Sequence, residues 1–199
     1  MIDEYAPDEQ AQLLHIARNT LDTVTSGGTR PQVDLQVLPP RLREERACFV
    51  TLTIDGELRG CTGTLVARRP LAEEVSFTTV QTAFNDPRFP PVTAAEAPKI
   101  EIEISILTPS VPLHIDTPDD LPRVLRPRID GVTLHLGPYR STFLPQVWER
   151  VPDPIEFLTL LSRKMGLQGD AWRDPRIEVE TYQSVVMVES EAHRTSSTT

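Results

Sequence analysis

Glu57-Leu58-Arg59-Gly60-Cys61-Thr62-Gly63-Thr64 is the stretch of sequence around which the fold is built. It follows an apolar, β-branched run, Cys48–Ile54, and the dipeptide Asp55-Gly56, which is typical of a tight turn between antiparallel strands. The pattern predicts a β-hairpin whose second arm runs from Glu57 to Val66. Cys61 then lies on a strand, between two glycines and two residues after an arginine.

The composition of this stretch points to chemistry at Cys61. In a regular strand Arg59 and Cys61 point to the same face, and a nearby positive charge favours the thiolate, which is the nucleophile and metal ligand. Gly60 and Gly63 let a ligand or another backbone approach closely. The same features also fit a small buried cysteine in a glycine-rich strand that packs against a helix, so both interpretations stay open. Cys48, inside an apolar strand, is expected in the core.

Apolar periodicity predicts helices and strands on both sides of the hairpin. One helix is expected over Pro7–Val24, and Gly27-Gly28 ends it. A second helix opens at Pro70 and stops before Pro87, because the residue preceding a proline is pushed out of helical geometry. Alternation of isoleucine with polar residues predicts a strand over Ile100–Ile106. The other expected elements are strands over Val132–Leu136, Tyr139–Leu144 and Ile177–Glu189, a short helix over Gln146–Arg150, and a helix from Asp153-Pro154 to Gly166.

The order of these elements predicts the fold class. Hairpins are mixed with helices without a regular strand–helix alternation, which favours an α+β fold over a doubly wound sheet. A chain of 199 residues can form one domain with a sizeable core, or one domain with two lobes. Residues 1–190 are assigned to this domain, and the polar, aperiodic residues 191–199 to a disordered tail.

Bulk composition excludes several classes of protein. The net charge of −9 argues against sequence-independent binding to nucleic acid. No apolar run approaches the roughly 20 residues of a membrane helix, and the first residues lack a secretory pattern. Two cysteines without an export signal suggest free thiols in a reducing cytosol, so we expect a cytoplasmic protein without a membrane partner. The cysteines and histidines have no metal-ligand spacing, so neither a metal nor another cofactor is expected.

Arg88 is a second candidate for a binding role. It lies in Asn85-Asp86-Pro87-Arg88-Phe89-Pro90-Pro91, a loop that its prolines make rigid. Such a loop gives a guanidinium a fixed direction toward a carboxylate or phosphate.

Two glutamates and two histidines are further candidates. Glu101 and Glu103 share one face of their strand, as paired carboxylates, as anionic partners of Arg59 or Arg88, or as a solvated outer face. His135 can orient or deprotonate a thiol, or it is a half-buried strand histidine. His114 lies in a proline-flanked segment and could approach a site from any direction.

Four motifs together resemble the AMMECR domain family, in family order and over a likeness that runs from about Leu13 to Val188. They are Leu58-Arg59-Gly60-Cys61-Thr62-Gly63, Asn85-Asp86-Pro87-Arg88-Phe89-Pro90-Pro91, Ile102-Glu103-Ile104-Ser105-Ile106-Leu107-Thr108-Pro109 and Thr142-Phe143-Leu144-Pro145-Gln146-Val147-Trp148. The resemblance implies a two-lobed α+β fold, with antiparallel or mixed sheets flanked by helices and a cleft between the lobes lined by Arg59-Gly60-Cys61. Two residues depart from the family pattern: Thr62 stands for isoleucine and is expected to point away from Cys61, and Ser141 stands for glycine.

The resemblance also bears on function, although no reaction is established for the family. Prokaryotic members are often encoded beside a Memo-like protein and a radical SAM protein, which suggests a shared pathway or modification. One hypothesis is a module that binds a small molecule or a partner segment in the cleft. The alternative is a cysteine-dependent enzyme or enzyme subunit, with Cys61 as nucleophile or modification site and Glu103 or His135 moving protons. The residues expected to contact a ligand are Arg59, Gly60, Gly63, Arg88 and Glu103.

Overall fold

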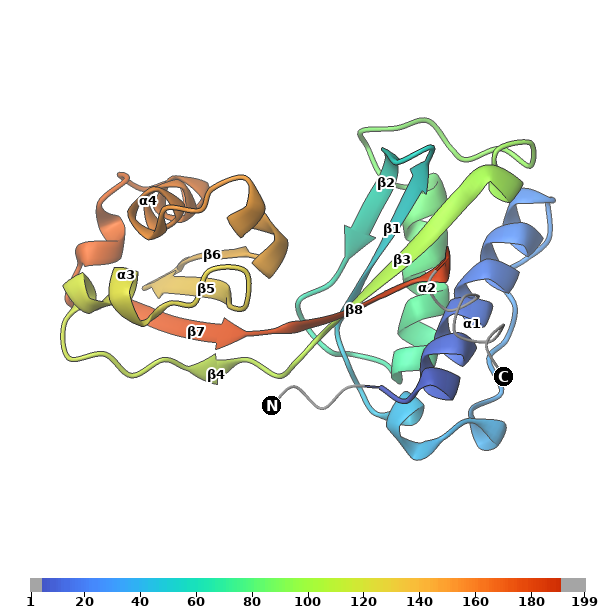
Figure 1. Ribbon diagram of the computed structural model, residues 1–199, viewed down its shortest axis with the longest axis horizontal. Helices are drawn as coiled ribbons and strands as arrows, with labels where there is room; N and C mark the ends of the chain where they lie inside the picture. The colour runs from blue at the N-terminus through green and yellow to red at the C-terminus, as the bar shows by residue number, and fades with distance from the viewer. Residues whose placement is uncertain (1–4, 191–199) are drawn as a thin grey trace. The chain divides into compact units, whose positions relative to one another are not determined.

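The structure is a computed structural model that describes residues 5–190 (Figure 1). The described chain divides into two compact units, one formed by residues 5–107 and 185–190 and the other by residues 108–184. Each unit contains a four-stranded sheet and at least one helix. The predicted α+β class is therefore confirmed, whereas the cleft between lobes stays a prediction.

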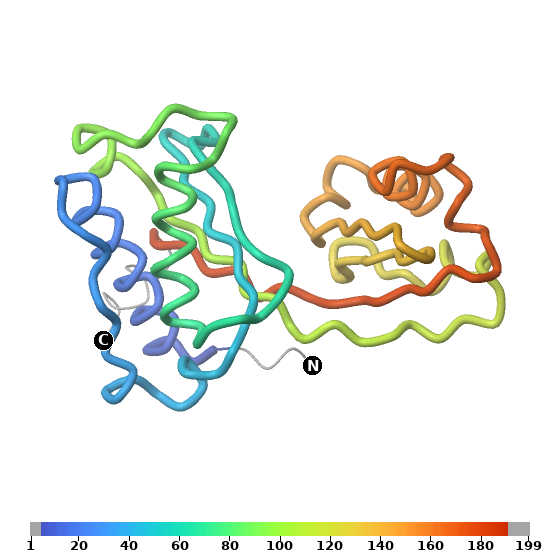
Figure 2. The backbone as a smooth tube through the Cα atoms, turned by 180° about the vertical axis from the view of Figure 1, so that it is seen from behind, coloured from blue at the N-terminus to red at the C-terminus, as the bar shows by residue number. Residues whose placement is uncertain are grey.

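The first unit is a sheet with two long helices on one face. Its strands lie in the order β2-β1-β3-β8, and β1 pairs antiparallel with both β2 and β3. Figure 2 shows α1 and α2 side by side along the same face of the sheet. The elements are α1 (Pro7–Thr25), β1 (Cys48–Ile54), β2 (Glu57–Gly63), α2 (Leu71–Phe84), β3 (Ile100–Leu107) and β8 (Ser184–Val188), with 3-10 turns at Leu35–Val37, Pro40–Arg43 and Ala97–Lys99. The predicted hairpin is confirmed, and its second arm ends at Gly63 rather than Val66.

Alternation along the strands explains why this sheet has two different faces. Successive side chains of a strand point to opposite sides, so the even-numbered residues Val50, Leu52, Ile102 and Ile104 face the helices and are fully buried. The odd-numbered residues between them are polar, and most are half-buried. The helices thus cover an apolar face and leave a polar face that carries Cys61.

The second unit is a sheet in the order β4-β7-β5-β6 packed against α4. The Trp148 and Phe157 rings stack in its core, with centroids 3.7 Å apart and planes 3° from parallel. Ser141 is buried and donates its hydroxyl to the Leu161 carbonyl at 2.7 Å, so the departure from glycine fastens β6 to α4. The elements are β4 (Val111–Pro112), α3 (Leu121–Val124), β5 (Gly131–Leu136), β6 (Tyr139–Phe143), α4 (Pro154–Lys164) and β7 (Glu178–Tyr182), with 3-10 turns at Pro118–Asp120, Pro145–Glu149 and Ala171–Arg173.

The prediction of one final strand over Ile177–Glu189 is wrong. That segment forms β7 in one sheet and β8 in the other, and the break falls at Gln183. Gln183 and Thr108 share two hydrogen bonds of 2.8 Å: the Thr108 N–H donates to the Gln183 carbonyl, and the Gln183 N–H donates to the Thr108 hydroxyl. The two segments that connect the units are therefore hydrogen-bonded to each other at Thr108 and Gln183. The predicted tail, residues 191–199, lies outside the described residues.

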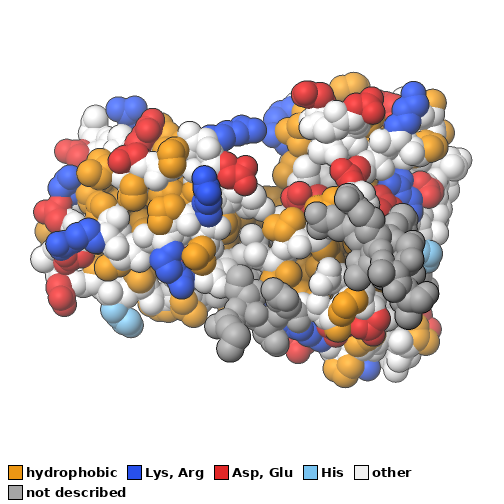
Figure 3. Space-filling model, in the orientation of Figure 1, with side chains coloured by type: hydrophobic (Ala, Val, Ile, Leu, Met, Phe, Trp, Pro, Cys, Tyr) orange, Lys and Arg blue, Asp and Glu red, His pale blue; other side chains and the backbone are white. Residues whose placement is uncertain are grey.

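The described chain carries charged side chains of both signs on its surface. On the face shown in Figure 3, Lys and Arg side chains are interspersed with Asp and Glu side chains over both units. Between residues 5 and 190, no helix is both long enough and apolar enough to cross a membrane.

We expect Phe157→Ala to lower the free energy of unfolding of the second unit by about 3–5 kcal/mol, because it empties a fully buried position against Trp148. Ile155→Ala on the same helix, where the side chain is 49% exposed, should cost about 0.5 kcal/mol or less. Denaturant unfolding followed by tryptophan fluorescence reports this unit, because both tryptophans lie in it. Equal losses in the two variants would contradict the stacked core.

Candidate functional site

Cys61 lies on β2, the edge strand of the first sheet, with its neighbours turned toward α2. Gly60 faces the helix so closely that a Cβ there would stand 2.9 Å from the Thr82 carbonyl oxygen. The Thr62 hydroxyl is 2.7 Å from the Thr82 hydroxyl, which confirms that Thr62 points away from Cys61. Cys61 is a free, half-buried thiol on the polar face of the sheet, and the Thr51 hydroxyl donates to its sulfur at 3.3 Å.

Three polar residues form a row across this face. Thr51 on β1 stands opposite Cys61 on β2 and opposite Glu103 on β3. Directly opposed residues have Cα atoms about 4.5–5.5 Å apart, so Thr51 lies between Cys61 and Glu103 on this face. The structure therefore brings Cys61 and Glu103, two of the predicted site residues, onto one face.

The regular alternation that would put Arg59 beside the sulfur is wrong for this strand. The register of β1 and β2 shifts at one point: Leu52 stands opposite Gly60, but Thr53 stands opposite Leu58. Arg59 is therefore the extra residue of a β-bulge, which re-aims its side chain. Its guanidinium pairs with Glu96, with 2.8 Å between Nε and Oε1, and donates to the Pro91 carbonyl. Hydrogen bonds from Arg59 and from Thr93 lower the pKa of Glu96 to about 2.

Asp86 and Arg88 complete the free edge of β2 at Cys61. The buried Asp86 carboxylate accepts the Cys61 backbone N–H at 2.9 Å, and Arg88 Nη2 donates to the Cys61 carbonyl at 2.8 Å. The two side chains also pair with each other, with 2.7 Å between Arg88 Nη2 and Asp86 Oδ2. An acceptor and a donor thus meet the backbone where a further strand would otherwise pair. Hydrogen bonds from Arg88 hold the pKa of Asp86 far below its usual range.

Arg88 is the arginine that contacts Cys61, through the Cys61 carbonyl. Hydrogen bonds to Asp86 are the chief cause that raises the pKa of Arg88. Three of the five N–H groups of Arg88 donate to oxygen atoms of Asp86 and Cys61, and the other two belong to Nη1. The side chain is 53% exposed, so part of this cation faces solvent.

The two glycines that flank Cys61 are explained by contacts within the chain. A Cβ at Gly60 would meet Thr82, and a Cβ at Gly63 would stand 2.4 Å from the Cys48 carbonyl oxygen and the Phe49 ring. Close approach at both positions is therefore made by the protein itself, and a ligand contact there stays a prediction.

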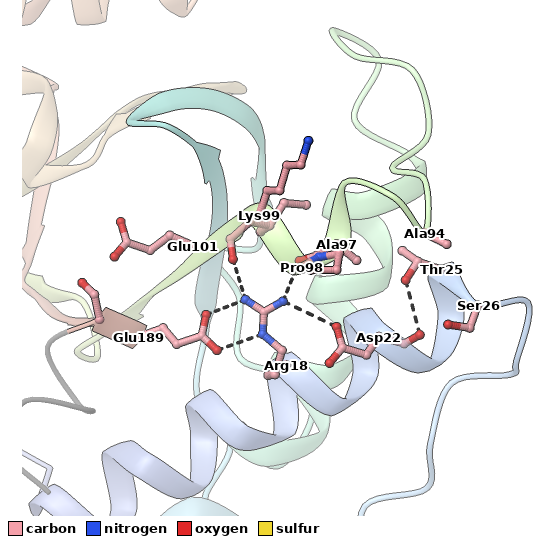
Figure 4. Close-up of a pocket in the computed structure, with 12 residues that line it drawn as sticks. Arg18, Asp22, Thr25, Ser26, Ala94, Ala97, Pro98, Lys99, Glu101 and Glu189 are labelled. Atoms are coloured by element: carbon pink, nitrogen blue, oxygen red, sulfur yellow. Dashed lines mark hydrogen bonds and ion pairs between the residues drawn. The ribbon is translucent and has the colours of Figure 1, made fainter. Parts of the chain in front are cut away.

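Glu101 lies on the border of a cavity of about 560 Å³ near the end of α1. Figure 4 shows Arg18, a residue of the cavity wall, joined to Glu189, Asp22 and Ala97. Arg18 also donates to the Ile100 carbonyl. The Arg18 bonds tie α1 to the start of β3 and to the segment after β8. Arg18 therefore holds these elements of the first unit together. Among the described residues that line this cavity, the sequence pattern indicated only Glu101 as a candidate.

The two candidate histidines lie in the second unit. His135 on β5 has its Nε2 atom 3.4 Å from Glu180 Oε2, and His114 is exposed after β4. Their predicted roles toward the thiol stay predictions. Within residues 5–190, no cluster of three or more His, Cys, Asp or Glu side chains has the arrangement of a metal site.

Sequence reasoning missed Asp86, Thr51 and Glu96. Asp86 had a local signal, since an aspartate two residues before an arginine can accept that residue's N–H, and Asp86 Oδ1 accepts the Arg88 N–H at 3.1 Å. Thr51 interrupts an apolar strand, which marks it as a residue of the polar face. Glu96 gave the signal Thr93-x-x-Glu96, because its carboxylate accepts the Thr93 N–H and hydroxyl, both at 2.8 Å.

Comparisons with known proteins agree with this architecture. The AMMECR1 family pattern matches residues 14–187. A protein of Methanothermobacter thermautotrophicus is 36% identical over 94% of this chain and 98% of its own length, and protein MJ0810 of Methanocaldococcus jannaschii is 32% identical over 92% of each. The crystal structure of the uncharacterized protein PH0010 from Pyrococcus horikoshii matches with a TM-score of 0.82 at 30% identity, over 92% of both chains.

Fold and site define an α+β protein with a half-buried cysteine on an edge strand. Both members of an ion pair are hydrogen-bonded to the backbone of that cysteine. The chain belongs to the AMMECR1 family, as its four ordered motifs predicted.

The Arg59–Glu96 pair should make stability depend on acid pH. Because folding lowers the pKa of Glu96 from 4.5 to about 2, its contribution is complete above 4.5 and is lost as the pH falls through 2. Glu96→Gln should lower the free energy of unfolding by about 1 kcal/mol at pH 7, and this difference from the wild type should shrink between pH 5 and about 2. Urea unfolding across that range measures it.

Arg59→Gln provides the control for this prediction. In an Arg59→Gln background, Glu96→Gln should change both the stability and its pH dependence much less, because the partner is already gone. An undiminished effect would show that Arg59 does not set the acid response.

Proposed function

We propose that this AMMECR1-family protein is a binding module whose site is the polar face of the first sheet around Cys61. Its ligand is a small molecule or a partner segment that presents a carboxylate or a phosphate. Arg88 directs that group, Cys61 and Thr51 line the contact, and Glu103 borders it. Arg59 acts indirectly, because its bond to Glu96 fixes the loop that carries Arg88.

The observation that carries the proposal is the fixed yet half-exposed guanidinium of Arg88. Asp86 and the Cys61 carbonyl hold the group in one orientation, so a ligand need not immobilise a flexible side chain. Planar guanidinium groups bind carboxylates and phosphates through paired N–H groups. The buried Asp86 offsets the charge, so we expect specificity to come from geometry more than from long-range attraction.

The protonation state of Asp86 favours binding over catalysis at this site. A carboxyl whose pKa lies far below its usual range stays ionised at neutral pH and is a poor proton acceptor. Arg88 cannot deprotonate in the accessible pH range. The two charged groups next to Cys61 therefore hold a structure in place rather than move protons.

A cysteine-dependent enzyme is the second candidate, and the row Cys61–Thr51–Glu103 is the observation that favours it. The Thr51 hydroxyl already donates to the sulfur, and Glu103 stands on its other side in register. In such an enzyme, the Thr51 hydroxyl would turn to give its proton to Glu103 and would take the thiol proton in return, which leaves Cys61 as the thiolate. A role for Cys61 as a modification site in a pathway with Memo-like and radical SAM proteins rests on the family resemblance alone.

Inorganic phosphate and acetate serve as probes of the binding proposal. Titration of either anion should shift the backbone NMR signals of Cys61 and Arg88. Arg88→Gln should weaken phosphate binding by about fivefold to tenfold, the loss of roughly one charge-assisted hydrogen bond. Arg88→Lys, which keeps the charge and loses the paired geometry, should weaken it less.

The exposed Arg68, which follows β2, provides the matched control. Arg68→Gln should leave phosphate binding at Cys61 within twofold of the wild type. Equal binding by the wild type and Arg88→Gln, or shifts that avoid Cys61, would refute the proposal.

Thiol alkylation separates the two candidate functions. If Glu103 accepts the thiol proton, Glu103→Gln should slow the reaction of Cys61 with iodoacetamide by about a hundredfold, the usual scale of general base assistance. The binding module predicts less than a twofold change, equal to that of the control Glu101→Gln. Cys48 does not interfere because it is fully buried and burial raises its pKa to about 12. A large loss in Glu103→Gln alone would favour the enzyme.

A further inference from the structure

A carboxylate is buried on the opposite side of β2 from Cys61. Glu74, in the first turn of α2, is only 2% exposed. Its Oε2 atom lies 2.9 Å from Arg69 Nη1, and its Oε1 atom accepts the Thr78 hydroxyl at 3.3 Å. A buried charge is costly unless it is paired, so this position requires a cation.

A cavity of about 280 Å³ opens beside this carboxylate, between β2 and α2. Its wall combines hydroxyls, side-chain amides, one carboxylate and one aromatic ring, and none of the described residues that line it is cationic. These groups can accept N–H bonds, and an aromatic face attracts cations. The lining residues are Thr62, Gly63, Thr64, Glu74, Phe77, Thr78, Gln81 and Asn85.

Arg69 shows how a cation is held at this place. Its guanidinium carbon lies 4.0 Å from the centroid of the Phe77 ring while Nη1 pairs with Glu74. The side chain is 39% exposed and comes from the connection between β2 and α2. Arg69 therefore reaches the carboxylate from solvent, and it is not among the residues that line the cavity.

We propose that this cavity binds a small organic cation with a primary ammonium or guanidinium group. The ligand's N–H groups pair with Glu74 and with the hydroxyl and amide oxygens of the wall, and its charge lies against Phe77. Arg69 competes for the same carboxylate and moves toward solvent when the ligand binds. The volume is just below the usual lower limit of about 300 Å³ for ligand sites, so the ligand has few heavy atoms.

This site is independent of the site proposed for Cys61. Thr62 and Cys61 are successive residues of β2 and point to opposite sides of the sheet, so the cation site and the thiol face share a strand but no side chain. Cys48 adds no negative charge near Glu74, because burial, and then the charge of Glu74, keep its thiol protonated.

Chemical rescue tests the proposal, with agmatine as the cationic probe and n-butanol as a neutral control. Arg69→Ala leaves Glu74 without its internal cation, so the variant should unfold at a lower temperature than the wild type. Agmatine at roughly ten times its dissociation constant for Arg69→Ala should raise the Tm of Arg69→Ala by about 3–6 °C, and the same concentration should raise the Tm of the wild type by less. Calorimetric titration should show binding at least threefold tighter to Arg69→Ala than to the wild type, because the competitor is gone.

The double variant Arg69→Ala/Glu74→Gln is the matched control, since it removes the carboxylate together with the competitor. It should show neither rescue nor binding, whereas Arg69→Ala/Glu73→Gln should behave as Arg69→Ala does. The proposal fails if agmatine raises the Tm of the Glu74→Gln double variant equally, if n-butanol rescues as well as agmatine, or if Arg69→Ala binds no more tightly than the wild type. If Arg69→Ala does not fold, the affinity of Arg69→Gln for agmatine is compared with that of the wild type instead, and the same tightening is expected.

Discussion

The Asp86–Arg88 ion pair, closed on the backbone of Cys61, is the interaction on which the first unit depends. β2 is an edge strand, and its exposed N–H and C=O groups need partners. Asp86 takes the N–H and Arg88 takes the carbonyl, so a loop performs at one residue what a neighbouring strand performs along its whole length. Asp86 and Arg88 belong to the same loop, so a loop that left β2 would leave the Cys61 N–H and C=O groups without these partners.

The two sides of β2 differ because α2 approaches one of them closely. Small residues make that approach feasible: Gly60 packs directly on Thr82, and Thr82 in turn donates to the Thr78 and Val50 carbonyls. Serines and threonines of α2 are buried, but hydroxyls that bond to carbonyls one turn earlier carry little desolvation cost. The two long helices of the first unit, α1 and α2, both lie on that one face of its sheet, and Cys61 is half-buried on the other face.

The sequence predicted those features that depend on local pattern, and missed those that depend on the path of the chain. The hairpin, α1 and α2 follow from turn residues, prolines and apolar spacing. The bulge at Arg59 has no such pattern, because it appears only when β2 is set in register against β1. The division of the last strand was hidden because residues typical of strands continue on both sides of Gln183, although the two halves join different sheets. Glu96 is 37 residues from Arg59, so their pairing requires knowledge of the loop between them.

Two of the family motifs prove to be one structural unit, since Asp86 and Arg88 of the second motif bind the backbone of Cys61 in the first. That union explains an aspartate and an arginine in the loop without any ligand. It does not explain a cysteine, because any residue except proline at position 61 would offer the same N–H and C=O groups. What the fold leaves unexplained is the sulfur itself, turned to the polar face, where it accepts the Thr51 hydroxyl. The function of this face therefore has to be sought in the side chain of Cys61 and in the part of Arg88 that solvent reaches.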